Sequence, residues 1–389
     1  MCIIKRFYNI ILLALGHSLN DFYCNFLPVL LPIIMPRLDL SLTLSGLLVM
    51  VMSITSNVLQ PVFGYLMDKK NFCWFLIPAI PFGALCICSI GFVNTKYLLF
   101  LLIALTGLSV STFHPLGSTL IHKAAEPKYR GTSMSLYVAG GNVGFACAPL
   151  IIVSFTQSYP LEYLPILMIP GFIMAIFYSR SSLAHETTVP DQLIQTAQKL
   201  PLHSLLAQRS VLSLNLSMSF RAWAHTAVAT FLPLLLIQQG YSAMAAGGML
   251  TIFLVGAAIG GLIGGYLGDR MGHKRLIVFS LLLGLVPTGY FFLHLTSDPL
   301  TLAALFLCGA SLQAPQPSSL IWAQQLLPNN AGMASGMMMG LAFGFGSAGT
   351  ALTAALADFI GLAAALLLIL PPMLCAAITA IYTPFAEQK

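Results

Sequence analysis

The chain has 389 residues, of which 58% are hydrophobic and only 7% are charged. Soluble domains usually have about 25% charged residues, so this composition excludes a soluble enzyme, a nucleic-acid-binding protein and a disordered chain. What remains is a polytopic membrane protein in contact with lipids. A bilayer core of about 30 Å needs roughly 20 apolar residues for each helical crossing.

Apolar runs between polar breaks predict an all-α protein with twelve transmembrane helices. The expected spans are 9–36, 43–66, 72–94, 97–121, 131–154, 160–178, 211–238, 243–268, 275–295, 299–322, 331–357 and 359–382. Residues 179–210 are the one long polar stretch. We therefore expect a six-helix bundle over 1–178, a cytoplasmic linker over 179–210 and a second six-helix bundle over 211–389.

The distribution of basic residues predicts the orientation in the membrane. With the N-terminus placed inside, fourteen of the 17 Lys and Arg residues lie in inner segments, while Arg37 and Lys96 lie in outer segments and Arg221 lies within a span. An excess of positive charge marks the cytoplasmic side of a membrane protein. Both termini are therefore expected to be cytoplasmic.

Three short matches indicate that the second half of the chain repeats the first. The matched pairs are Phe26-Leu27-Pro28 with Phe231-Leu232-Pro233, Gly64-Tyr65-Leu66-Met67-Asp68 with Gly265-Tyr266-Leu267-Gly268-Asp269, and His114-Pro115 with Gln316-Pro317. Their offsets are 205, 201 and 202 residues. Two six-helix halves in the same orientation form a parallel repeat, which is one architecture of secondary transporters.

The second repeated loop continues as Asp269-Arg270-Met271-Gly272-His273-Lys274-Arg275. This sequence resembles the cytoplasmic loop motif of the major facilitator superfamily. The resemblance implies a conformational latch made by Gly64, Asp68, Gly265, Asp269, Arg270, Gly272, Lys274 and Arg275. Its acid can cap a helix end or pair with a base across the seam between the halves. A loop that only sets the membrane orientation would carry similar positive charge.

A closer resemblance runs along the first half. The motifs are His17-x-x-Asn20-Asp21, Leu59-Gln60-Pro61-x-x-Gly64, Phe113-His114-Pro115 and Gly140-Gly141-Asn142-x-Gly144. They resemble the fosmidomycin-resistance branch of the same superfamily, which consists of bacterial efflux proteins of the drug:proton antiporter type. The resemblance implies antibiotic efflux across a bacterial inner membrane. The glycines of the fifth span also suit close helix packing alone.

Costly polar groups concentrate in the first, fourth, seventh and tenth spans, which line the central cavity in the superfamily that the chain resembles. Asp21 is the only carboxylate well inside a span, and His17 lies one helical turn before it. A low-dielectric cavity favours the protonated carboxyl group, whereas a nearby positive charge favours the ionised one. We therefore predict proton coupling at Asp21, His17 and His114. The alternative is a structural Asp21 that holds the first span to a neighbour.

Arg221 is the only base within a span, and its guanidinium group suits a carboxylate or phosphonate. It is expected either to bind an anionic substrate or to pair with Asp21; the alternative is a side chain that reaches back to the membrane surface. Pro115 and Pro317 are expected to break the fourth and tenth spans. The predicted substrate-binding residues are Arg221, Asn20, His225, Trp223, Gln313 and Gln316.

The sequence contains no nucleotide-binding loop, no nucleophile motif and no metal-ligand cluster, so we expect neither an enzyme nor a cofactor. The leading hypothesis is a proton-coupled exporter of a small polar or anionic, antibiotic-like compound or metabolite, working by alternating access. The alternatives are a proton- or anion-coupled importer of a small organic acid and a non-transporting membrane receptor. The identity of the substrate and the oligomeric state stay open.

Overall fold

The computed structural model describes residues 2–186 and 202–384, and these residues form helices and short connections without any strand. Within this part of the chain, eleven helical runs are long and apolar enough to cross a membrane. The predicted tenth span corresponds to two further helices, α14 (Pro299–Gln313) and α15 (Pro315–Leu326), which are separated only by Ala314. The predicted all-α membrane fold is confirmed.

The chain divides into two compact units. Unit 1 comprises Met1–Glu126, Leu136–Lys199 and Asn329–Gly340, and unit 2 comprises Pro127–Ser135, Leu200–Pro328 and Leu341–Lys389. Each unit therefore contains a short segment from the other half of the sequence, which the predicted boundaries at 178 and 211 do not include. Residues 187–201 of the predicted linker lie outside the described residues.

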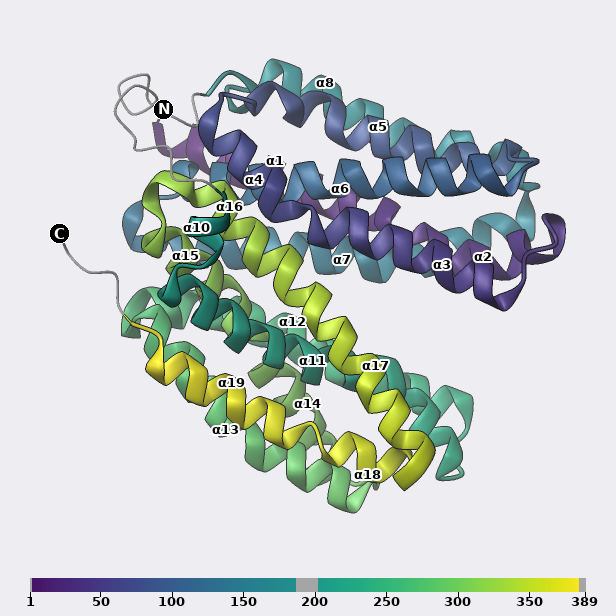
Figure 1. Cartoon of the computed structure of the whole chain (residues 1–389), viewed down its shortest axis with the longest axis vertical. Helices are drawn as coiled ribbons and strands as arrows, with labels where there is room; N and C mark the ends of the chain where they lie inside the picture. Colours follow the sequence, from purple (N-terminus) through teal and green to yellow (C-terminus); the bar gives the residue numbers. More distant parts are fainter. Residues whose placement is uncertain (1, 187–201, 385–389) are drawn as a thin grey trace. The chain divides into compact units, whose positions relative to one another are not determined.

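Unit 1 holds most helices of the first half (Figure 1). Asn25 separates α1 from α2, and its amide donates to the Phe145 carbonyl oxygen at 2.9 Å. Helices α5, α6 and α8 lie side by side in both views. The helices are α1 (Cys2–Cys24), α2 (Phe26–Arg37), α3 (Leu42–Ser53), α4 (Gln60–Lys69), α5 (Leu76–Cys88), α6 (Lys96–Ala124), most of α7 (Arg130–Ser158), α8 (Ile169–Arg180) and α16 (Ala331–Gly336).

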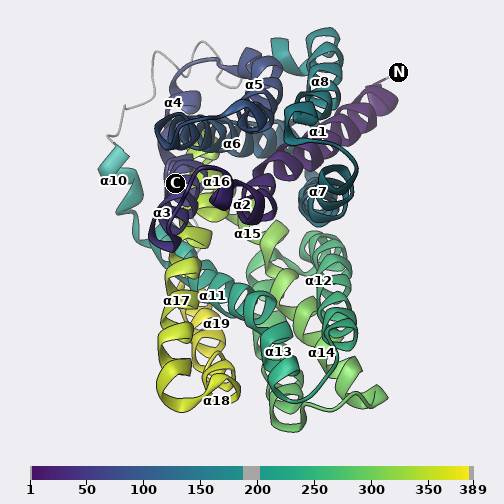
Figure 2. The same cartoon turned by 90° about the vertical axis from the view of Figure 1, so that its right-hand side faces the viewer.

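Unit 2 holds the remaining helices. Figure 2 shows α14 beside both α12 and α13, and α11 packs against α17 and α19. The helices are α10 (Leu202–Leu206), α11 (Arg209–Gln238), α12 (Ala243–Met271), α13 (His273–His294), α14, α15, α17 (Ala342–Ile360), α18 (Leu362–Leu367) and α19 (Leu370–Tyr382).

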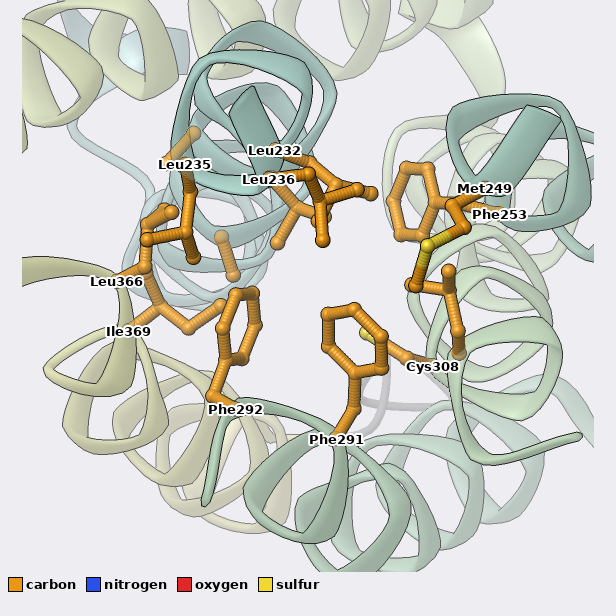
Figure 3. Close-up of a cluster of buried hydrophobic side chains, with 14 of the residues drawn as sticks. Leu232, Leu235, Leu236, Met249, Phe253, Phe291, Phe292, Cys308, Leu366 and Ile369 are labelled. Atoms are coloured by element: carbon orange, nitrogen blue, oxygen red, sulfur yellow. The ribbon is translucent and has the colours of Figure 1, made fainter. Parts of the chain in front are cut away.

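Buried apolar side chains from six helices, α11 to α14, α18 and α19, meet in the interior of unit 2 (Figure 3). In a bilayer such packing holds helices together through van der Waals contact, because lipid tails are as apolar as the side chains. The labelled members are Leu232, Leu235 and Leu236 on α11, Met249 and Phe253 on α12, Phe291 and Phe292 on α13, Cys308 on α14, Leu366 on α18, and Ile369 just before α19.

The predicted proline breaks occur at only one of the two sites. Helix α6 continues through Pro115, so that prediction is wrong. A single proline removes one hydrogen bond and leaves the other turns of the helix intact. In the tenth span, Pro315 and Pro317 follow closely on one another, and the helix is interrupted at Ala314. Two missing donors within three residues explain why the interruption occurs there.

Asp298 is the N-cap residue of α14 and lies just before the tenth membrane-spanning segment. Its carboxylate accepts hydrogen bonds from the backbone N–H groups of Leu300 and Thr301, which caps α14. Further hydrogen bonds from the Thr296 and Thr301 hydroxyl groups hold the pKa of Asp298 below its usual range. The side chain is therefore ionised at neutral pH and favours the helix N-terminus.

Candidate functional site

Asp21 lies at the centre of a polar cluster in unit 1. Its Oδ1 atom accepts a hydrogen bond from His114 Nε2 at 2.8 Å and one from the Asn20 amide at 3.2 Å. Its Oδ2 atom lies 3.3 Å from Nε2 of His17, one turn earlier on α1. The structure therefore brings together the three residues predicted for proton coupling, together with Asn20. The Asp21 side chain is 19% exposed, whereas that of His17 is 3% exposed.

The orientation of His17 is fixed by helix α7. Its Nδ1 atom lies 2.7 Å from the Tyr137 carbonyl oxygen, which can only accept a hydrogen bond, so Nδ1 carries the proton. The His17 ring also stacks on the Tyr137 ring with a centroid distance of 4.1 Å. Nε2 is therefore a lone pair in the neutral ring, and it is aimed at the Asp21 carboxylate.

His114 is held from its other side by helix α4. Gln60 Nε2 donates to the Ser56 carbonyl oxygen at 2.7 Å and to His114 Nδ1 at 3.1 Å. His114 Nδ1 therefore accepts, and Nε2 carries the proton that is donated to Asp21. Gln60, which belongs to the Leu59-Gln60-Pro61 motif of the sequence, is therefore part of this cluster.

Gly141 makes room for the cluster on the α7 side. A Cβ atom at this position would lie 2.6 Å from both Asp21 Oδ2 and His17 Nε2. A Cβ at Gly140 or Gly144 would clash with the backbone carbonyl of Ala14 or Ser18 on α1, as the predicted small-residue face requires. The role of Gly141 was missed because a glycine beside a polar site and a glycine in a packing stripe look alike in a sequence.

Arg221 is fully buried in unit 2 on α11. Its Nη1 atom donates to the Leu312 carbonyl oxygen and to Gln313 Oε1, each at 3.1 Å, and its Nη2 atom donates to Gln316 Oε1 at 2.7 Å. The guanidinium group also lies 5.1 Å from the centre of the Phe343 ring. Three of the predicted substrate-binding residues therefore form one group around the interruption of the tenth span.

The partners of Arg221 are all neutral. Among the described residues Arg221 makes no ion pair, and its Nε–H group has no hydrogen-bond acceptor. A buried charge without a counter-ion is unfavourable, so the site can gain stability from an anion. The alternative of a side chain that reaches the membrane surface is wrong, because the Arg221 side chain is enclosed.

The two other predicted residues of α11 differ in their surroundings. His225 lies one turn after Arg221, and within the described chain its Nδ1 atom is buried without a hydrogen-bond partner. No hydrogen bond within the described chain therefore fixes this atom. Trp223 donates instead to the Thr353 hydroxyl group at 2.8 Å and packs on Gly349 of α17. That contact joins two helices of unit 2.

The repeated acids at the ends of α4 and α12 cap two helices. Within unit 1, Asp68 accepts from the N–H groups of Gly332 and Met333 at 2.8 Å each, where α16 begins. Within unit 2, Asp269 accepts from the N–H groups of Gly131 and Thr132 and from the Thr132 hydroxyl group, each at 2.7 Å. A carboxylate at a helix N-terminus is favoured by the helix dipole.

The glycines of the motif allow close approach and a tight turn beside these caps. A Cβ at Gly64 would clash with the Gly332 carbonyl group, and one at Gly265 would clash with Gly131. Gly272 has φ of +90°, which only glycine adopts freely, in the turn between α12 and α13.

The bases have separate roles. Lys69 and Arg270 repeat one contact, each lying over a tyrosine ring four residues earlier at 4.1 and 4.4 Å. Lys274 donates to the Thr383 carbonyl oxygen at 2.7 Å, whereas Arg275 is exposed.

A family model described as Major Facilitator Superfamily matches residues 13–349 and 214–389. The chain belongs to the major facilitator superfamily. It is therefore a multi-pass membrane protein of a family of secondary active transporters rather than of enzymes.

Two bacterial relatives span most of the chain. An uncharacterized MFS-type transporter, YfnC of Bacillus subtilis (strain 168), is 29% identical over 367 residues, which cover 91% of this chain and 87% of the relative. The fosmidomycin resistance protein of Escherichia coli (strain K12) is 27% identical over 356 residues, which cover 89% of this chain and 85% of the relative. The resemblance to the fosmidomycin-resistance branch is confirmed as homology.

Solved structures of the superfamily share the fold. The E. coli fucose:proton symporter FucP matches with a TM-score of 0.78 at 15% identity over 98% of this chain and 99% of that one. The human organic anion transporter MFSD10 (TETRAN) matches with a TM-score of 0.74 at 15% identity over 96% and 99%. At such identities the likeness concerns the fold alone.

Proposed function

We propose that the chain is a proton-coupled exporter of a small anionic compound and works by alternating access. The observation that carries this proposal is the position of Asp21 between two imidazole rings, with His114 Nε2 at 2.8 Å and His17 Nε2 at 3.3 Å. An ionisable residue within a transmembrane segment is costly and by default marks a proton or ion pathway.

The atoms of this cluster define a place for one proton. Oδ1 of Asp21 already accepts from His114, whereas Oδ2 faces the lone pair of His17 Nε2. A proton on Asp21 Oδ2 or on His17 Nε2 joins these two atoms by a hydrogen bond. Without that proton, a carboxylate oxygen faces a lone pair. The pair therefore has two states that differ by one proton, which is what a coupling site requires.

The Arg221 group supplies a place for the substrate. Its unpartnered Nε–H group, together with Gln313, Gln316 and His225, offers a positive charge and several hydrogen-bond donors and acceptors. Such a set suits a carboxylate, phosphonate or phosphate group. Efflux of an antibiotic-like compound is favoured by the name of the E. coli relative. Import of a small organic acid uses the same chemistry and is the second candidate.

The sign of a pH gradient separates these candidates. Purified protein is reconstituted into vesicles with an acidic interior, and labelled fosmidomycin, inorganic phosphate and a small dicarboxylate are tested as probes. A proton antiporter accumulates its substrate inside, because outward proton flow drives inward substrate flow, whereas a symporter expels it. Accumulation of an anionic probe supports the exporter. Expulsion indicates the importer, and no movement of any anionic probe contradicts the proposal.

We also propose that the Asp68 and Asp269 caps act as a conformational latch, present in one of the alternating states. Asp269→Asn replaces one acceptor oxygen by a donor NH₂ group that faces N–H donors. We expect the protein to insert normally, the capped state to lose about 1–3 kcal/mol and turnover to fall. Transport per mole of inserted protein is measured, with Asp358→Asn at an exposed position as the matched control. Unchanged turnover of Asp269→Asn would show that the loop only sets orientation.

We propose further that the protein lies in a bacterial inner membrane with a cytoplasmic linker near residues 179–210 and both termini in the cytoplasm. A reporter active only in the cytoplasm should be active when it is fused after Lys389 and inactive in the 295–299 turn. A reporter active only in the periplasm should give the reverse pattern. Periplasmic activity at Lys389 would overturn both the orientation and the count of twelve spans.

A further inference from the structure

Three potential metal ligands meet in unit 1. His17, Asp21 and His114 each offer one ligand atom, and these atoms all lie within 4.8 Å of one another. His17 and Asp21 are four residues apart on α1 and share one face, the spacing that places two metal ligands side by side on a helix. His114 contributes from α6. The ligand set therefore comes from two helices of the same compact unit.

His17 Nε2 is the atom that points to a bound cation. The His17 residue is only 2% exposed, and Nε2 has no hydrogen-bond partner within the described part of the chain. Because Nδ1 donates to the Tyr137 carbonyl oxygen, a neutral ring presents the Nε2 lone pair to Asp21 Oδ2 at 3.3 Å. Two electron-rich atoms at that distance require a positive charge between them, either a proton or a metal ion.

We propose that a divalent transition-metal ion of the zinc class binds to His17 Nε2, the Asp21 carboxylate and His114 Nε2, in the place of the proton. Two imidazoles and one carboxylate are a donor set that zinc and its neighbours prefer, whereas magnesium and calcium prefer oxygen ligands alone. Ligand atoms of a tetrahedral zinc ion are about 3.3 Å apart for bonds of about 2.0 Å. Asp21 Oδ2 lies 3.3 Å from His17 Nε2 and Asp21 Oδ1 lies 2.8 Å from His114 Nε2, both within about 0.5 Å of that value. The ligand atoms of all three residues lie within 4.8 Å of one another, so the two histidines must approach each other slightly to share one ion.

The neighbours of the cluster suit this ion once three side chains, Asn20, His114 and Gln60, rearrange. The Asn20 amide nitrogen lies 3.0 Å from His114 Nε2 and must turn away from it. The Tyr137 carbonyl oxygen that accepts from His17 Nδ1 is the kind of outer partner that metal-bound histidines usually have. His114 must release its proton from Nε2 and carry one on Nδ1 instead. The Gln60 amide then turns so that its Oε1 atom, which has no hydrogen-bond partner in the described structure, accepts from Nδ1 in exchange for the bond to Ser56.

Three protein ligands leave the fourth position open. One carboxylate offsets only half of the charge of a divalent ion, so a hydroxide or another small anion is the favoured fourth ligand. Gly141 keeps this space free, because a Cβ there would lie 2.6 Å from Asp21 Oδ2 and from His17 Nε2. The ion and the coupling proton use the same atoms and therefore exclude one another.

The test measures Zn²⁺ itself, without substrate or gradient, so its result is independent of the transport proposal. The full chain without an affinity tag is purified in detergent, stripped with a chelator and titrated with Zn²⁺ by calorimetry, and with Co²⁺ as an absorbing substitute. We expect one ion per chain and intense visible Co²⁺ bands of a four-coordinate site. His17→Gln, Asp21→Asn and His114→Gln should each weaken binding at least about tenfold, while His294→Gln at an exposed site should not.

Gly141→Ala tests the site without removing any of the three metal-ligating side chains. It retains all three ligands and fills the space beside them, so Zn²⁺ binding should weaken while thermal unfolding shows a folded protein. The proposal is overturned if the wild-type chain shows no saturable binding of one Zn²⁺ ion. It is equally overturned if His17→Gln and Asp21→Asn bind Zn²⁺ as the wild type does.

Discussion

Asp21→Asn is expected to abolish substrate accumulation driven by a pH gradient, down to the level of protein-free vesicles. Asn has nearly the shape of Asp, and its amide can still contact His17 and His114, but it cannot gain or lose the proton. Substrate binding, and exchange of labelled for unlabelled substrate without a gradient, should persist. The measurement compares gradient-driven accumulation with this exchange in the same vesicles.

Asp358→Asn is the matched control for the charge change, because Asp358 is exposed near the end of α17. It should transport as the wild type does. If Asp21→Asn accumulates substrate fully, Asp21 has only a structural role, in which case His17 and His114 hold the first span to its neighbours and the proton is carried elsewhere.

Arg221→Lys is expected to weaken binding of an anionic substrate by about 1–3 kcal/mol, roughly 5- to 150-fold. The two Nη atoms of Arg221 reach the Leu312 carbonyl oxygen and Gln316 at the same time, with Nε left for a ligand. A single ammonium group keeps the charge but cannot occupy all these positions. Affinity is measured by titration of the purified protein with each anionic probe.

Two controls make this result specific. Arg180→Lys makes the same Arg-to-Lys substitution at the exposed end of α8 and should leave the affinity for the anionic probe unchanged. A neutral compound that the wild type transports should bind equally well to Arg221→Lys. Equal loss of affinity for neutral and anionic compounds would instead show that Arg221 acts by holding α11 to the tenth span.

The charged residues of both sites can be predicted from the sequence because their chemistry contrasts with the apolar spans around them. A carboxylate or a guanidinium group within an apolar span stands out whatever the fold, and the repeat places His114 and Gln316 at matching positions. Gln60 and Gly141 carry no such signal, because an amide or a glycine in a span usually serves packing. Their roles depend on which helices are neighbours, and one sequence does not contain that information.

For a similar reason, the sequence does not predict that each unit contains a short segment from the other half of the chain. The capping acid at each repeated loop was predicted, with a helix end as one of two possible partners. Its actual partner, the start of α7 for Asp269 and of α16 for Asp68, is a backbone N–H group, which every sequence offers at every helix start. The sequence predicts an interruption at Pro317, whereas the helix is interrupted at Ala314, directly before Pro315.

If Asp21 carries the coupling proton, binding of the exported substrate must release that proton, and this release can be measured. Purified protein in weakly buffered detergent solution at mildly acidic pH receives the anionic probe with the highest affinity, and proton release is followed with a pH indicator. The proposed antiport mechanism predicts release of protons by the wild type and none by Asp21→Asn, although both bind the probe. Equal release by the two proteins, or none by a wild type that binds, would contradict the mechanism.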